Sequence, residues 1–184
     1  ILTYEVIYDG KKMIESSALG LNTDMGDYTH NLTLKNHTAG KVDEKYTMSR
    51  TKASSAHYIA NTISIELTAE KAPYPMTFTM QVSNNDIAYK YDLGGSHTTD
   101  KDEPRRVTIL NEASSFRFPD KTTTFICPQT VGNHFGWMST KPSYEEEYKA
   151  DAPMAEKSAF GHGFTFPCLF HIGDDGWVLV SETG

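Results

Sequence analysis

Apolar and polar residues alternate along two segments in the middle of the chain. The first segment runs from Thr62 to Thr68, and the second runs from Met76 to Val82 with polar residues between its apolar ones. Alternation with a period of two is typical of a strand that turns one face to a core and the other to water. The pattern therefore predicts two half-buried β-strands.

Other short segments rich in β-branched and aromatic residues also predict strands. These segments are Thr3–Tyr8, Ile87–Leu93, Val107–Leu110, Thr123–Ile126, Phe164–Ile172 and Trp177–Ser181. Turn-forming residues separate several of them, and Asp9-Gly10 supplies the positive φ angles of a tight hairpin. Helical periodicity is weak, and only Tyr144–Lys157 could contain a short helix, which Pro153 limits. We therefore expect an all-β, mostly antiparallel sandwich that forms a single domain over residues 1–184.

Composition and charge narrow the classes of function. The 184 residues include 17 Lys and Arg against 24 Asp and Glu, which gives a net charge of −7. This acidic balance argues against a nucleic-acid partner, because phosphate binding needs clustered cations. No apolar run approaches the roughly 20 residues of a membrane span. The chain starts at Ile1 without a signal peptide and stops just after an apolar segment, so we expect it to be a fragment of a longer protein.

Cysteine, histidine and serine residues give little sign of catalysis. Cys127 and Cys168 are expected to be buried free thiols, as free cysteine usually is, although a single disulfide stays open. Cys168 and His171 have a chelating spacing, but no second pair completes a zinc site, and residues three apart in a strand face opposite sides. No Gly-x-Ser-x-Gly elbow or phosphate-binding glycine loop is present. We assign no catalytic residue.

Two features suggest sugar binding or a ligand at a strand end. The segment His134–Trp137 precedes the acidic and aromatic segment Tyr144–Tyr148, and such residues can stack on sugar rings and accept hydrogen bonds from hydroxyls. Trp137 and Glu146 are therefore candidate substrate-binding residues, with a solvated acidic loop beside a core tryptophan as the alternative. Glu182 follows an apolar strand, where scaffolds present functional groups, but spacing alone favours an ordinary surface residue.

Several segments together resemble the N-terminal domain of glycoside hydrolase family 97 over nearly the whole chain. They are Val6–Lys11, Ile14–Leu21, Asn84–Tyr91, Glu112–Phe118, and the tail from Phe164–Pro167 through Trp177–Glu182. The resemblance rests on the order and spacing of these segments, since each motif alone is short. It implies a β-supersandwich of the galactose-mutarotase type. In the parent enzyme this domain would pack against a catalytic (β/α)8 barrel that the present chain lacks.

The resemblance also implies an activity and a metal. Family members hydrolyse α-glucosidic or α-galactosidic bonds of oligosaccharides, need calcium, and act in the periplasm of Bacteroides-like bacteria, so the parent protein is expected to be periplasmic or secreted. The domain lends one calcium ligand, which corresponds here to Glu182 in the step Ser181-Glu182. Thr183 departs from the small residue that many relatives carry next. The chain alone is expected to be inactive, because the catalytic residues belong to the barrel.

Three hypotheses follow. The leading one is a non-catalytic domain that shapes the sugar pocket and supplies a calcium ligand through Glu182. The strand before Glu182 should be anchored by Val178 and Val180 on one face and by Trp177 and Leu179 on the other.

The second hypothesis is a stand-alone mutarotase-like enzyme, which would instead pair Glu182 with His134, His162 or His171 as base and acid. The third hypothesis is a carbohydrate-binding module built around Trp137 and Tyr144–Tyr148.

Overall fold

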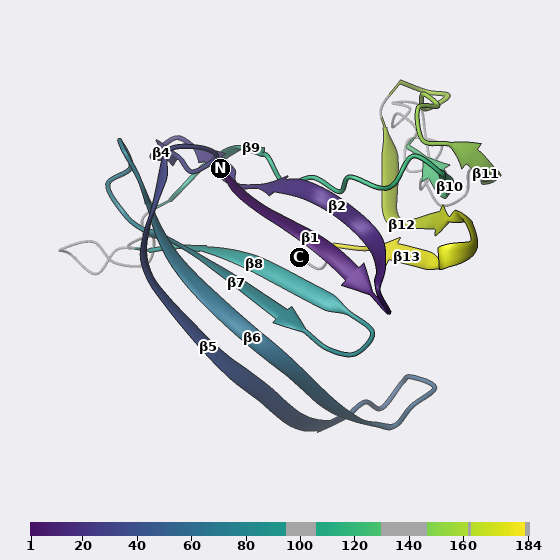
Figure 1. Cartoon of the computed structure of the whole chain (residues 1–184), viewed down its shortest axis with the longest axis horizontal. Coiled ribbons are helices and arrows are strands. Elements are labelled where there is room, and N and C mark those ends of the chain that lie inside the picture. Colours follow the sequence, from purple (N-terminus) through teal and green to yellow (C-terminus); the bar gives the residue numbers. More distant parts are fainter. Residues whose placement is uncertain (95–105, 130–146, 162, 183–184) are drawn as a thin grey trace, which may run out of the picture. The chain divides into compact units, whose positions relative to one another are not determined.

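The computed structural model describes residues 1–94, 106–129, 147–161 and 163–182, and these residues lie largely in β-strands (Figure 1). The strands are β1 (Leu2–Tyr8), β2 (Lys11–Leu19), β3 (Leu21–Thr23), β4 (Gly26–Asp27), β5 (Leu32–Thr47), β6 (Ser55–Ala69), β7 (Met76–Val82), β8 (Ile87–Leu93), β9 (Ile109–Glu112), β10 (Thr122–Pro128), β11 (Lys149–Pro153), β12 (Phe164–Ile172) and β13 (Trp177–Val180). A single turn of 3-10 helix, Gly173–Asp175, joins β12 to β13. The strand pairs whose register is described are antiparallel, which confirms the all-β fold.

The chain divides into two compact units. Ile1–Thr3 and Ala18–Ser115 form the first unit, and Tyr4–Ser17 and Phe116–Gly184 form the second. Strands β1 and β2 pair with each other and contribute residues to both units. Compactness does not show whether a unit folds independently, so the single domain expected from the sequence stays a prediction.

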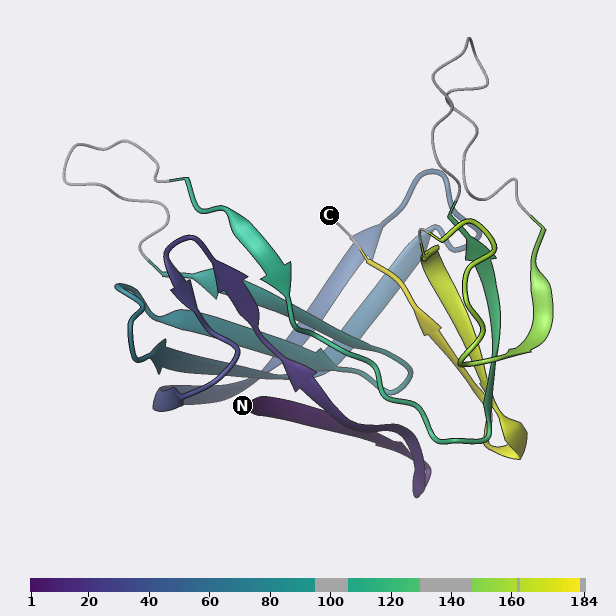
Figure 2. The same cartoon turned by 90° about the horizontal axis from the view of Figure 1, so that it is seen from above.

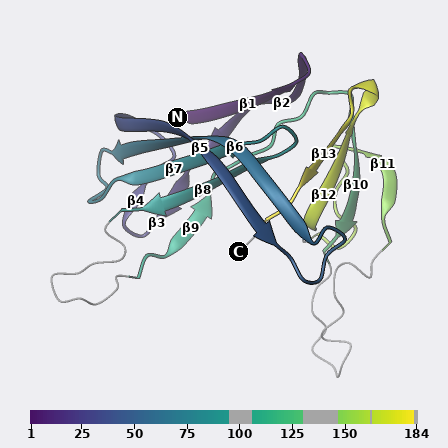
Figure 3. The same ribbon diagram turned by 90° about the horizontal axis from the view of Figure 1, so that it is seen from below.

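The first unit is built on a four-stranded sheet in the order β5-β6-β7-β8, together with a smaller sheet in the order β4-β3-β9. Strands β5 and β6 form a long antiparallel pair (Figure 3), whose register runs from Leu32 opposite Ala69 to Thr47 opposite Ser55. The buried residues that form the core of this unit are Leu21, Tyr28, Leu67, Ala69 and Met76. Strands β6 and β7 supply Leu67, Ala69 and Met76 and so bury part of the predicted apolar face, whereas Ile63 and Val82 at the other end of that face are exposed.

Tyrosine hydroxyls satisfy backbone groups at the border of this core. The hydroxyl of Tyr28 donates a hydrogen bond to the carbonyl oxygen of Tyr74 at 2.9 Å. The Tyr91 hydroxyl accepts one from the backbone N–H of Gly20 at 2.9 Å and lies 2.6 Å from the hydroxyl of Ser114. Burial raises the pKa of both phenols, so each stays protonated and able to donate at neutral pH.

The second unit contains a four-stranded sheet in the order β11-β10-β12-β13, drawn from green to yellow in Figure 2. Its buried core consists of Met13, Ile14, Phe118, Ile172 and Val180. Phe118 also stacks on Phe170 of β12, with the ring centroids 4.1 Å apart. Cys127 and Cys168 are buried free thiols, as the sequence predicted.

The structure agrees with most strands that the sequence predicts and corrects one segment. Strands β7, β8 and β12 have the predicted bounds, whereas β9 begins and ends two residues later than expected. The prediction of a short helix within Tyr144–Lys157 is wrong for the described part of that segment, which contains strand β11. The segment forms a strand because it pairs with β10. Pro153 is tolerated there because β11 lies at the edge of the sheet, where a proline does not interrupt the hydrogen-bond ladder.

The Asp9-Gly10 hairpin has the backbone that its sequence requires. Asp9 has a φ of 49° and Gly10 a φ of 72°, so both central residues adopt the left-handed conformation of a primed turn. This turn joins β1 to β2 and therefore fixes their pairing.

Candidate functional site

Glu182 lies just beyond the end of strand β13. Val180, the last residue of the strand, is buried and pairs with Cys168 of β12, and Val178 packs against the same core. Ser181 and Glu182 follow and are exposed. The strand therefore carries the Glu182 carboxylate at a well-anchored end, as expected.

The other face of β13 differs from the expectation. Trp177 is 54% exposed and Leu179 is 63% exposed, so neither side chain anchors the strand in the described chain. Alternation explains the difference, because Val178 and Val180 take the core face and their neighbours must point away from it. The strand is thus held from one side.

The described residues do not form a complete metal site. No group of three or more His, Cys, Asp or Glu residues within the described ranges could hold a metal ion. Calcium takes six to eight oxygen ligands. A calcium ion at Glu182 would therefore need further oxygen ligands beside this carboxylate.

The candidate sugar-binding residues fall outside the part of the chain that the structure describes. Trp137 and Glu146 lie there, as do His134 and His162. Tyr148, at the end of the same acidic segment, is described and stacks on Phe125 of β10 with ring centroids 5.1 Å apart. The predicted roles of Trp137 and Glu146 stay predictions.

The structure reveals a row of side chains that the sequence gave no reason to connect. Thr123, His171 and Trp177 are direct neighbours across β10, β12 and β13. The imidazole of His171 is stacked on the indole of Trp177, with ring centroids 4.0 Å apart and planes 7° apart. Asp151 of β11 completes the row, because its Oδ1 lies 3.1 Å from Nδ1 of His171 and accepts a hydrogen bond from Thr123 at 2.8 Å.

His171 and Glu182 lie at opposite ends of the paired strands β12 and β13. His171 pairs with Trp177, the first residue of the strand, whereas Glu182 follows its last residue. Five residues of extended backbone span on the order of 15 Å. The two side chains therefore form no acid and base pair of the kind that the mutarotase hypothesis requires.

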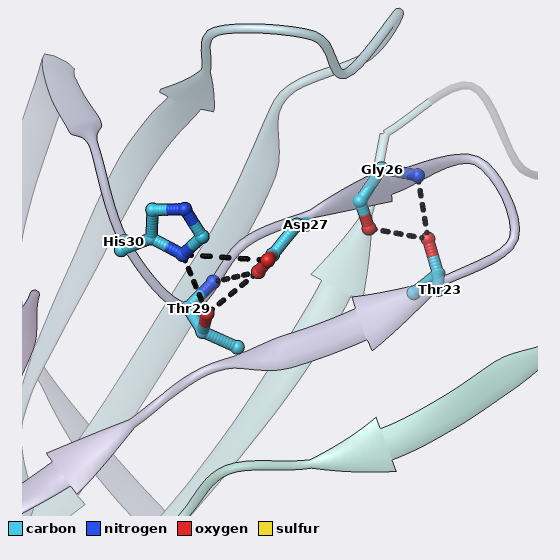
Figure 4. A network of polar contacts seen from close by, with 5 residues as sticks. All are labelled: Thr23, Gly26, Asp27, Thr29 and His30. Atoms are coloured by element: carbon cyan, nitrogen blue, oxygen red, sulfur yellow. Dashed lines mark hydrogen bonds and ion pairs between the residues drawn. The ribbon is translucent and has the colours of Figure 1, made fainter.

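A polar network in the first unit contains a hydroxyl, an imidazole and a carboxylate (Figure 4). Asp27 Oδ1 accepts hydrogen bonds from the backbone N–H of Thr29 at 2.8 Å and from its hydroxyl at 2.6 Å. These bonds hold the pKa of Asp27 below its usual value, aided by the nearby charge of His30. Because the Thr29 hydroxyl donates its hydrogen bond to Asp27, it is not activated by His30 as a nucleophile would be. The network stabilises a turn.

Comparison with known proteins gives a consistent result. The whole chain, residues 1–184, matches the family described as Glycosyl-hydrolase 97 N-terminal. The structure is similar to the crystal structure of a beta-arabinopyranosidase, with a TM-score of 0.86 and 50% identity over 99% of this chain and 28% of that chain. No curated protein matches the chain.

More distant solved structures share the fold. They include a glycoside hydrolase family 97 enzyme from Pseudoalteromonas sp. strain K8, once in complex with panose and once with acarbose. Each has a TM-score of 0.71 and 13% identity, over 94% of this chain and 24% of that chain. The chain thus spans only about a quarter of the length of these solved proteins. Its described residues include no helix long and apolar enough to cross a membrane.

Proposed function

The chain belongs to the glycosyl-hydrolase 97 N-terminal family, and from this premise we propose that it is part of a longer glycoside hydrolase whose catalytic domain lies outside the chain. The observation that carries the proposal is the 50% identity to a beta-arabinopyranosidase over 99% of this chain. This chain covers only 28% of that enzyme, and the remaining length is ample for a catalytic domain in the same protein. The substrate would be an oligosaccharide or glycoside.

The proposed substrate preference is for arabinopyranosides. The relative that shares half of its residues with this chain is named for that activity, whereas the proteins in complex with panose and acarbose share 13%. An arabinopyranoside lacks the exocyclic hydroxymethyl group of a glucoside or galactoside, so a fitted pocket would have no room for that group. The α-glucoside and α-galactoside activities considered from the sequence then become secondary.

The experiment compares three substrates on the full-length protein. Values of kcat/KM are measured for three 4-nitrophenyl glycosides: the β-arabinopyranoside, the α-glucopyranoside and the α-galactopyranoside. We expect the arabinopyranoside to be preferred by about tenfold or more, the order of discrimination that a steric difference in a pocket supplies. Preference for the glucoside would overturn the substrate assignment, and hydrolysis of none of the three would overturn the proposed activity.

We further propose that Glu182 supplies one carboxylate ligand to a calcium ion shared with the catalytic domain. Support comes from its exposure, its chemistry and its anchored position beyond β13. A bound calcium ion would neutralise nearby carboxylates and orient substrate hydroxyls, while Glu182 would tie this domain to the rest of the site. Trp137 and Glu146 are proposed to line the sugar pocket. The protein is proposed to be periplasmic or secreted, which cell fractionation would test.

A further inference from the structure

The row formed by Asp151, His171 and Trp177 has a rigid backbone beneath it. Thr123 lies opposite His171, and His171 lies opposite Trp177, so three neighbouring strands place these residues on one face. The alternate residues Phe170 and Val178 pack into the core on the other face. The row therefore lies on the outward face of the β11-β10-β12-β13 sheet.

Asp151 reaches the row from an unusual backbone conformation. Its φ is 49°, and the ladder between β10 and β11 shifts register beside it, between Thr124 and Ile126. This region is strained for a non-glycine residue, and bulges commonly redirect a side chain next to a binding site. The distortion directs the Asp151 carboxylate at Thr123 and His171.

The hydrogen bonds of Asp151 set the protonation of the row. The hydroxyl of Thr123, and then His171, hold the pKa of Asp151 below its usual value, so the carboxylate stays ionised and can only accept. The Nδ1 of His171 must then be the donor in their contact. In the neutral ring this leaves Nε2 as an acceptor, and the ring plane is held parallel to Trp177.

The indole of Trp177 presents a large apolar ring surface at the border of the sheet. Strand β13 is the last strand in the described order of this sheet, and Trp177 is 54% exposed. His171 covers the indole from the β12 side only. Leu179, Leu169 and Phe125 form a second row on the same face and extend the apolar surface away from the polar end.

We propose that the Asp151–His171–Trp177 row is a carbohydrate-binding platform, on which one pyranose ring stacks against the indole face that His171 leaves open, while His171, held by Asp151, keeps the indole in place from behind. A pyranose has an apolar face of C–H groups, and the oriented indole of Trp177 matches that face. The choice of a sugar ligand rests on the proposed function. The platform lies at the opposite end of β13 from Glu182.

The test is affinity electrophoresis of the full-length protein in native gels that contain larch arabinogalactan or soluble starch. We expect one or both polysaccharides to retard the wild-type protein. Trp177→Ala should weaken that binding by about tenfold, the order expected when one aromatic contact is lost. Trp177→Phe should keep part of the binding, because it retains a ring. Asp151→Asn should weaken it by loosening His171.

A matched control is Tyr46→Ala, which removes an exposed aromatic ring from β5 in the first unit and should leave retardation unchanged. Hydrolysis of the 4-nitrophenyl glycosides is measured on every variant and should stay within about twofold of the wild type. Loss of retardation at normal hydrolysis supports the platform. Retardation through Trp177 in a protein without hydrolytic activity would refute the proposed activity while supporting sugar binding.

Three outcomes would overturn the proposal. The wild-type protein could migrate normally in both gels, or Trp177→Ala could be retarded as strongly as the wild type. A third outcome is that Trp177→Ala loses its retardation together with a change of its mass in light scattering, which would make this face an interface between proteins.

Discussion

Val180 of β13 lies directly opposite Cys168 of β12, and both side chains are buried. This pair fixes the register of β13 at its last residue. Glu182 follows only two residues later, where its carboxylate is exposed. The position of the proposed calcium ligand is thus set by the core of the second unit, through a short piece of backbone.

The first prediction tests this carboxylate. Glu182→Gln keeps the shape of the side chain but removes its charge. In the full-length protein we expect the calcium concentration for half-maximal hydrolysis to rise by at least about tenfold, a loss typical even for groups that only support a metal ligand. The measurement is activity against free calcium, with circular dichroism to show an intact fold.

The matched control for this prediction is Asp174→Asn, which neutralises another exposed carboxylate, in the turn that precedes β13. It should leave calcium dependence unchanged. Normal hydrolysis by Glu182→Gln at limiting calcium would show that Glu182 is not a ligand.

The strands that could be predicted are those with one buried face. In β7, Met76 and Phe78 are buried and their neighbours are more exposed, so the sequence pattern reports the geometry directly. Strand β5 was missed because most of its 16 residues are exposed, and its long polar sequence carries no alternation. Pairing with β6 specifies it instead. Strand β2 was missed because adjacent residues, Met13 and Ile14, are both buried.

The candidate sites also differ in whether they could be predicted from the sequence. Glu182 could be named from the sequence only because its segment resembles a known family, and its anchoring by Val178 and Val180 follows from alternation. The contact between Asp151 and His171 could not be predicted, because it depends on a bulge and a positive φ at Asp151. Neither feature has a signature in the local sequence, which contains no glycine at that position.

The second prediction concerns Gly20. Its φ is 151°, and a Cβ placed there would lie 2.7 Å from the carbonyl oxygen of Tyr28 and 2.9 Å from Cα of Thr29. Both contacts are to backbone, which cannot move aside without disturbing the core around Tyr28. We expect Gly20→Ala to lower the free energy of unfolding by about 3 kcal/mol, from backbone strain and overpacking together.

Chemical denaturation measures this effect, and Gly40→Ala is its control. A Cβ on Gly40 would lie 3.4 Å from the methyl group of Thr62, a side chain on the exposed pair β5–β6. Because glycine weakens a strand interior, this variant should be neutral or more stable by about 0.5 kcal/mol. Equal stability of the two variants would contradict the close approach at Gly20.

The third prediction concerns the reactivity of the two thiols. Cys127 is 1% exposed and Cys168 is 9% exposed, and burial raises the pKa of the Cys168 thiol. Because the thiolate is the reactive form, iodoacetamide should label both residues slowly in the native protein and rapidly in guanidinium chloride. Peptide mass spectrometry measures each residue separately. Rapid native labelling, or a peptide pair joined by a disulfide, would contradict the buried free thiols.

The last prediction is a pH dependence. Lys121 bonds to the carboxylate of Asp175, and Lys11 lies 3.4 Å from its other oxygen. These contacts, that of Lys121 foremost, hold the pKa of Asp175 below the usual 3.8. A lowered folded-state pKa means that the paired carboxylate favours the folded state above pH 3.8, and that this contribution disappears as the pH falls through the folded pKa.

We therefore expect Lys121→Met to raise the pKa of Asp175, which carboxyl carbon NMR measures. The same variant should lose part of the acid sensitivity of unfolding. Lys71→Met, which removes a lysine from the first unit, should change neither quantity. An unchanged Asp175 titration in Lys121→Met would show that the ion pair does not form in solution.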